Sequence, residues 1–271
     1  MAARIILGLM TFSPDVNAGG RLLSVSDLTT ALDKFSARGY TELNTARTQG
    51  GWKERGFTIG TKVFPQYAGA HGPETLTAAF KTSLTELGTD CIFYHHAPDR
   101  YTPFTTTLST LNNLHRAGKF RRLGLSNFSA FKLAEIVTTC HANNWIRIES
   151  GLLPACRRYG IDFIAYSTIV ASLLSGPVFQ GVGLCGGGGV WLVHHSRIDV
   201  SRWDGIILGV SKLGQLEGSM DALERGQLDG EMLEEVERVG RTARVDDRPF
   251  RYGEPYGYET AEVLFGEGED E

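Results

Sequence analysis

Short apolar segments alternate along this chain with longer amphipathic segments, and this alternation constrains the fold more strongly than any other feature. Seven apolar segments bounded by Gly, Asn or Asp lie at residues 5–9, 41–45, 58–63, 91–96, 123–127, 162–167 and 205–210, and a weaker eighth lies at 145–149. Residues 25–37, 73–87, 105–117, 130–143 and 212–225 instead carry apolar side chains at helical spacing. Strand and helix patterns in alternation predict βαβ units around a parallel sheet.

A (β/α)8 TIM barrel is the architecture that this pattern favours. The chain has 271 residues, and a barrel of this kind needs about 250. No glycine-rich GxGxxG turn follows the first apolar segment, which argues against a doubly wound dinucleotide-binding sheet. We therefore expect one barrel domain over residues 1–241 and a polar C-terminal tail over residues 242–271.

Two segments do not fit a complete barrel. Between residues 149 and 151 there is no room for a loop, and residues 177–189 contain the run GVGLCGGGG where an outer helix is expected. Each glycine disfavours a helix by about 1 kcal/mol relative to alanine. The glycine run lacks the Lys-Ser/Thr end of a phosphate-binding loop, which is the less favoured interpretation. We expect a barrel that is incomplete around strand 6 and helix 7.

Composition excludes several classes of protein. The net charge is -4 and the 27 Lys and Arg residues are scattered, so no nucleic-acid surface is expected. The apolar stretch near the N-terminus is too short for a membrane span, and the four cysteines form no CxxC pair that would indicate a zinc site or a disulfide framework. His115, His194 and His195 lie in segments with helical patterns but without an HExxH-type arrangement, so no metal site is expected. These features predict a soluble, cytoplasmic protein.

A lysine and a histidine lie at the ends of two successive apolar segments. Lys62 stands near the end of the segment 58–63, and His96 ends the segment 91–96. Barrel enzymes carry their chemistry at the carboxyl ends of the strands, so we expect these two side chains to lie close together in an active site.

The ordered motifs of the chain resemble the aldo-keto reductase family, and within it the branch of the aflatoxin-aldehyde reductases and their fungal relatives. The matching motifs are GLMTF at 8–12, GYTELNTA at 39–46, TK at 61–62, HAPDR at 96–100, GKF at 118–120, GLSNF at 124–128 and GVSKLGQLE at 209–217. The resemblance implies an NADPH-dependent carbonyl reductase, with NADP as cofactor, a small-molecule aldehyde or ketone as substrate, and four catalytic residues: Asp, Tyr, Lys and His.

Two of those four positions are occupied as the resemblance requires. Lys62 and His96 match the family lysine and histidine, whereas Asn44 stands at the aspartate position, so that an ion pair with Lys62 becomes at best a hydrogen bond. The tyrosine that donates the proton is expected shortly after residue 46, where the sequence reads RTQGGW. An asparagine near a strand end can also simply cap the following turn, which is the alternative interpretation of Asn44.

The resemblance also implies a set of cofactor-binding residues. Ser126 and Asn127 match the pair that holds the nicotinamide carboxamide, Tyr166 matches an aromatic under the nicotinamide, and Ser167 is expected to reach the pyrophosphate. Tyr166 fits a core aromatic equally well. The helix start at Gly209, Ser211, Lys212 and Gln215 suits the 2'-phosphate, because a helix N-terminus and a cation attract anions.

Three functions remain open from the sequence. The first is a reductase of an aldehyde or ketone, with a fungal natural-product pathway suggested by the resemblance around residues 153–160, LPACRRYG. The second is a non-catalytic paralogue that binds nucleotide without turning over. The third is a truncated, inactive product whose unpaired strand edges favour aggregation.

Overall fold

The computed structural model describes most of the barrel region of the chain. The residues that it describes are 4–13, 20–45, 52–88, 91–99, 101–128, 130–146, 148–149, 156–158, 160–166, 193–196, 198–231, 233–234 and 238. Within this part of the chain, the helices are all too short or too polar to cross a membrane. The predicted C-terminal tail and the glycine-rich run lie outside the described residues.

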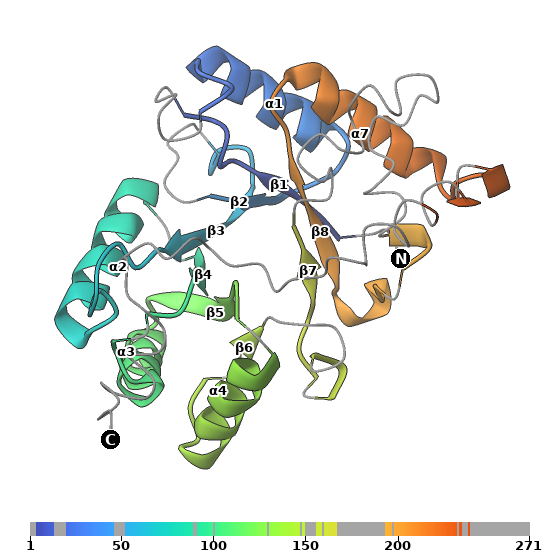
Figure 1. Ribbon diagram of the computed structural model, residues 1–271. Coiled ribbons are helices and arrows are strands. Elements are labelled where there is room, and N and C mark those ends of the chain that lie inside the picture. The colour runs from blue at the N-terminus through green and yellow to red at the C-terminus, as the bar shows by residue number, and fades with distance from the viewer. Residues whose placement is uncertain are drawn as a thin grey trace, which may run out of the picture.

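In the described part of the chain, eight parallel strands form one sheet in the order β6-β5-β4-β3-β2-β1-β8-β7. Their bounds are β1 Arg4–Gly8, β2 Glu42–Asn44, β3 Thr58–Val63, β4 Cys91–His95, β5 Phe120–Leu125, β6 Ile148–Glu149, β7 Ile164–Ala165 and β8 Gly205–Gly209. The sheet is curled and the helices lie outside it (Figure 1). β6 and β7 are its two edges, so among the described strands the barrel is not closed by hydrogen bonds between them. The predicted incomplete (β/α)8 barrel is confirmed.

The helices begin and end at residues that favour those ends. They are α1 Val25–Ala37, α2 Pro73–Leu87, α3 Phe104–Arg116, α4 Ala130–Ala142 and α7 Leu213–Arg225. The Ser24 side chain accepts a hydrogen bond from the Asp27 N–H at 3.0 Å and caps α1. α2 begins with a proline in its first turn and ends at Gly88, whose φ of 66° is the left-handed conformation in which glycine is favoured. These bounds lie within a residue or so of the predicted helices.

Three strands differ from the sequence-based expectation by two residues or more, and the first of them, β6, begins at Ile148 instead of residue 145. β5 begins at Phe120, three residues before the predicted start, because Arg121 and Arg122 lie at the rim of the sheet, where polar side chains reach solvent or ion-pair partners. It ends at Leu125 because Asn127 has a φ of 65°, which takes the chain out of the sheet. β7 is confined to Ile164–Ala165, since the residues before it turn toward side-chain contacts instead.

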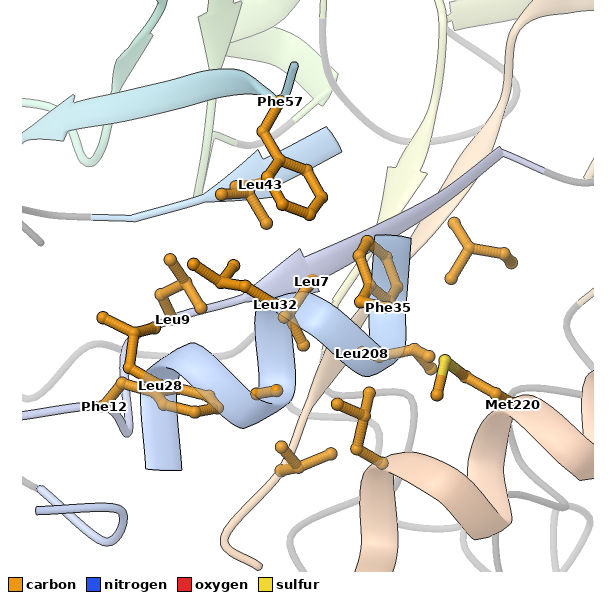
Figure 2. Packing of buried hydrophobic residues seen from close by; sticks show 14 of the residues in the cluster. Leu7, Leu9, Phe12, Leu28, Leu32, Phe35, Leu43, Phe57, Leu208 and Met220 are labelled. Carbon is orange, nitrogen blue, oxygen red and sulfur yellow. The ribbon is translucent and has the colours of Figure 1, made fainter. Parts of the chain in front are cut away.

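The core lies between the sheet and its helices, in two clusters. In the first, Leu28, Leu32 and Phe35 of α1 pack on Leu7 of β1 and Leu43 of β2, and Met220 of α7 adds to the same cluster (Figure 2). The second cluster joins α2, α3 and α4 to β3 and β5. Several of these side chains are fully buried, so truncating any one to alanine is expected to cost about 2–5 kcal/mol.

Ion pairs join the amino ends of the strands. Arg4 at the start of β1 binds Glu42 at the start of β2 through two hydrogen bonds of 2.6 and 2.9 Å. Arg122 of β5 binds Asp162, which precedes β7, at 2.7 Å. In a barrel this end serves stability, while the carboxyl end is free for chemistry.

Candidate active site

Asn44, Lys62, His96 and Asn127 all lie at the carboxyl ends of neighbouring strands. Asn44 is the last residue of β2, Lys62 is the penultimate residue of β3, and His96 follows β4 directly. The register pairs Val63 with His95, which sets Lys62 and His96 at the same end of two adjacent strands. The structure therefore brings together the two residues that the sequence placed at strand ends.

The Lys62 ammonium is held by a neutral group. Its Nζ donates a hydrogen bond to Oδ1 of Asn44, whose side chain is buried. Burial lowers the pKa of Lys62 to about 8, because the charged ammonium loses hydration that an amide oxygen only partly replaces. A hydrogen bond thus stands where the resemblance implies an ion pair.

His96 is a neutral imidazole. Burial first, and then the nearby charge of Lys62, lower the pKa of His96 to about 4. Its ring lies edge-on to Phe64, with ring centroids 5.3 Å apart. At neutral pH the ring is therefore an uncharged hydrogen-bonding group beside a cation, which suits it to hold the oxygen of a polarised carbonyl.

The Asn127 side chain connects three strand ends. Its Nδ2 donates to the His96 backbone oxygen at 2.7 Å and to Ser126 Oγ at 3.1 Å, and its Oδ1 accepts from the Tyr166 hydroxyl at 2.7 Å. Both amide hydrogens are used, and one Oδ1 lone pair remains for a ligand. Tyr166 is 48% exposed, so it is not a core aromatic. The structure brings Ser126, Asn127 and Tyr166 together beside His96.

The start of α7 lies past the end of β8. Gly209 is the last residue of β8, and a Cβ there would meet nothing within 4 Å. The Gln215 Oε1 accepts hydrogen bonds from the Ser211 N–H at 2.8 Å and the Lys212 N–H at 3.1 Å. Gln215 thus caps the helix, while Lys212 is exposed and able to meet an anion.

Asp99 is a residue of this region for which the sequence analysis predicts no role. It is 3% exposed and accepts hydrogen bonds from the backbone of Gly69, His71 and Tyr101, and from the Thr102 hydroxyl. Burial alone would raise the pKa of Asp99, but these hydrogen bonds together lower it. The signal was the Pro-Asp pair after His96, since an aspartate after a proline commonly bonds the backbone of its own turn.

Some predicted features fall outside the described residues. These are Ser167 and the segment 46–51, where the family tyrosine is expected. Trp52, which follows that segment, is buried and begins a turn rather than a helix. The roles proposed for Ser167 therefore stay predictions.

Comparison with known proteins identifies the family. A model of the aldo/keto reductase family matches residues 4–181. An aldo-keto reductase of Pseudocercospora fijiensis is 26% identical over 81% of this chain and 99% of its own length. Aflatoxin B1 aldehyde reductase member 2 of Mus musculus is 29% identical over 81% of this chain and 82% of its own length. The oxidoreductase sirO of Leptosphaeria maculans is 27% identical over 89% of this chain and 95% of its own length. Because the family model covers well over half of the chain, this protein belongs to the aldo/keto reductase family.

Proposed function

We propose that this protein is an NADPH-dependent reductase that converts an aldehyde or ketone to an alcohol. The observation that carries the proposal is the grouping of Lys62, Asn44 and His96 at the carboxyl end of a curled parallel sheet in an aldo/keto reductase. A cation and a neutral imidazole side by side are suited to a carbonyl oxygen on which negative charge develops.

The residues present fit a nicotinamide dinucleotide. A neutral amide and hydroxyl at Asn127 and Ser126 match a carboxamide, the exposed ring of Tyr166 lies beside them, and Lys212 at the start of α7 provides a cation for a phosphate. When bound, the cofactor supplies the hydride. We propose that Gly209 and Ser211 also line the path of the cofactor. A phosphate that binds the N–H groups of Ser211 and Lys212 must displace the Gln215 side chain from at least one of them.

The protein's own residues orient and polarise the substrate. His96 is neutral, so it can donate a hydrogen bond to the carbonyl oxygen without repelling the cation beside it. Lys62, held by Asn44, brings positive charge to the same place. A preorganised donor and cation stabilise the developing alkoxide more than they stabilise the neutral carbonyl, and this difference lowers the barrier.

The fungal relatives extend the proposal to the physiological setting. Two of the relatives compared above, an aldo-keto reductase and an oxidoreductase, come from fungi, and a third, the aldo-keto reductase pigE of Monascus ruber, is 29% identical over 68% of this chain and 60% of its own length. We propose a fungal biosynthetic pathway as the source of the substrate. Cys140 and Cys156 are buried cysteines, which agrees with a reducing compartment such as the cytoplasm.

Titration of the purified chain with NADPH, followed by nicotinamide fluorescence, tests the proposal. Binding with consumption of NADPH in the presence of 4-nitrobenzaldehyde supports the reductase. Binding without consumption favours the second candidate, a nucleotide-binding paralogue, for which the specific observation is the amide of Asn44 in place of a carboxylate. Failure to bind NADPH contradicts both functions.

A matched pair of variants locates the activity. Lys62→Met is expected to abolish turnover while the fold is kept, whereas Lys119→Met is expected to leave it unchanged, because Lys119 is exposed and precedes β5 at the opposite end of the sheet. Equal turnover in the two variants would remove Lys62 from the site.

A further inference from the structure

Lys62 is a partly buried amine whose hydrogen-bonding partner in the described structure carries no charge. Its Nζ donates to Oδ1 of Asn44 at the end of β2. An ammonium has three N–H donors, so this contact leaves donors that can turn toward a bound ligand. A neutral acceptor positions the amine but does not hold the proton on it, as a carboxylate would.

Two imidazoles lie after the ends of β3 and β4, and both are neutral. His96 follows the adjacent strand and is close enough for the charge of Lys62 to lower its pKa. His71, in the loop after β3, is fully buried, and burial lowers its pKa to about 4. Neither ring therefore carries a positive charge at neutral pH, so neither lowers the pKa of Lys62 beyond the effect of burial.

The carboxylates on the surrounding elements are engaged elsewhere. Asp99, after β4, is bound by backbone N–H groups and the Thr102 hydroxyl. Glu42 binds an arginine at the amino end of β2, away from the site, and Glu74 lies in the exposed first turn of α2. Burial is thus the effect that sets the pKa of Lys62, and it brings that pKa to about 8. A general acid works best when its pKa is near the working pH.

We propose that Lys62 is itself the proton donor of the reduction, not an assistant to a tyrosine. This proposal rests on the proposed function. The carbonyl carbon accepts a hydride, with its two electrons, from the reduced nicotinamide of NADPH. The π electrons of the C=O bond move to the oxygen. The oxygen takes a proton from the Lys62 ammonium as one N–H bond breaks and one O–H bond forms. The products are the alcohol, oxidised nicotinamide and a neutral amine, and the amine regains its proton from water.

Three variants separate Lys62 from other donors in NADPH-consumption assays over a range of pH. Lys62→Arg keeps the positive charge but cannot release a proton, so kcat is expected to fall by about 10²–10⁴-fold while NADPH affinity is retained. Asn44→Asp places a carboxylate against the ammonium, so the alkaline fall in kcat is expected to move up by roughly 1–3 pH units. Tyr67→Phe removes an exposed phenol after β3 and is expected to leave kcat unchanged.

A direct titration provides a readout that does not depend on turnover. In protein made with isotope-labelled lysine, the NMR signal missing from the Lys62→Arg spectrum belongs to Lys62. The pH at which this signal is halfway through its titration is expected near 8 in the wild-type chain and at a clearly higher value in Asn44→Asp. A merely structural lysine would not couple its titration to the pH profile of kcat in this way.

The outcomes distinguish this proposal from the function on which it rests. If the wild-type chain consumes no NADPH with any carbonyl, the proposed function fails and the proposal fails with it. If the wild type turns over and Lys62→Arg keeps kcat within about threefold of it, the proposal alone is overturned. It is also overturned if Tyr67→Phe abolishes turnover, or if the signal of Lys62 titrates at the ordinary pH of a lysine.

Discussion

Replacing Asp99 by asparagine is expected to loosen the two loops that follow β3 and β4. The side chain is 3% exposed, and its Oδ2 accepts the His71 N–H at 3.0 Å and the Thr102 hydroxyl at 2.7 Å. Its Oδ1 accepts the Tyr101 N–H at 3.0 Å and the Gly69 N–H at 3.3 Å. Because these donors come from both loops, one carboxylate fixes the loop after Lys62 relative to the loop after His96.

The structure sets the size of the effect. Asparagine keeps one acceptor oxygen and presents an NH2 group to the donors on the other side, so about two hydrogen bonds to a charged group are lost. Each such bond contributes roughly 1.5–3 kcal/mol, and partial rearrangement leaves an expected net loss of about 2–4 kcal/mol. For a chain of this size that loss corresponds to a drop in Tm of roughly 4–16 °C.

Thermal unfolding followed by circular dichroism measures the change, with Asp33→Asn as the matched control. Asp33 is an exposed aspartate that binds Arg55 at 2.7 Å, and an exposed ion pair of this kind contributes about 0–1 kcal/mol. A melting temperature for Asp99→Asn that stays within about 2 °C of the control would refute the reasoning, because the buried carboxylate would then contribute no more than a surface one.

Three further predictions concern other parts of the molecule. Gly205→Ala places a Cβ 2.6 Å from the backbone oxygen of Arg4 at the start of β1. It is expected to destabilise the fold by roughly 1–3 kcal/mol, measured as a lower urea midpoint of unfolding. Gly209→Ala in the same strand, where the Cβ meets nothing within 4 Å, is the control and is expected to leave that midpoint unchanged. His71 and His96 have pKa values lowered from 6.5 to about 4, so the unfolded chain binds more protons between these values. Stability should therefore be complete above pH 6.5 and fall by up to about 3 kcal/mol per histidine toward pH 4; a urea midpoint that is flat over this range would contradict the assignment. Tyr166→Phe removes one side-chain hydrogen bond and is expected to cost about 1 kcal/mol and to weaken NADPH binding, measured by fluorescence titration; unchanged affinity would place the tyrosine outside the cofactor site.

The strands and helices could be predicted because local patterns determine them. The sequence predicts a strand at residues 58–63, which is β3, and helices at residues 25–37 and 73–87, which are the bounds of α1 and α2. In each, the apolar spacing and the end residues agree with the packing against the sheet. The meeting of Lys62 and His96 followed from topology alone, since parallel strands end at the same edge.

The contacts that complete the site could not be predicted, because they join residues distant in sequence. Nothing in the local pattern links Tyr166 to Asn127, 39 residues earlier, or gives Asp99 its donors in the preceding loop. The capping role of Gln215 competes with the cofactor role that the resemblance implies, and only the helix geometry reveals that competition. Resemblance identified Asn44 as a site residue, whereas the hydrogen bond to Lys62 required coordinates.

Closure of the barrel and binding at its mouth depend on the same side chains. β6 and β7 are the sheet edges, yet β5 is tied to the region of β7 at both ends: Arg122 binds Asp162 at 2.7 Å at the amino end, and Asn127 binds Tyr166 at 2.7 Å at the carboxyl end. β6 and β7 have only two residues each and do not pair with one another in the described sheet, so these side-chain contacts link β5 to the region of β7 in place of backbone pairing. Since Asn127 also holds the His96 backbone, a ligand that competes for its amide would act on the closure of the barrel and on the position of the histidine together. A complete barrel would separate these two tasks, because its backbone hydrogen bonds close the sheet without help from the residues that bind the ligand.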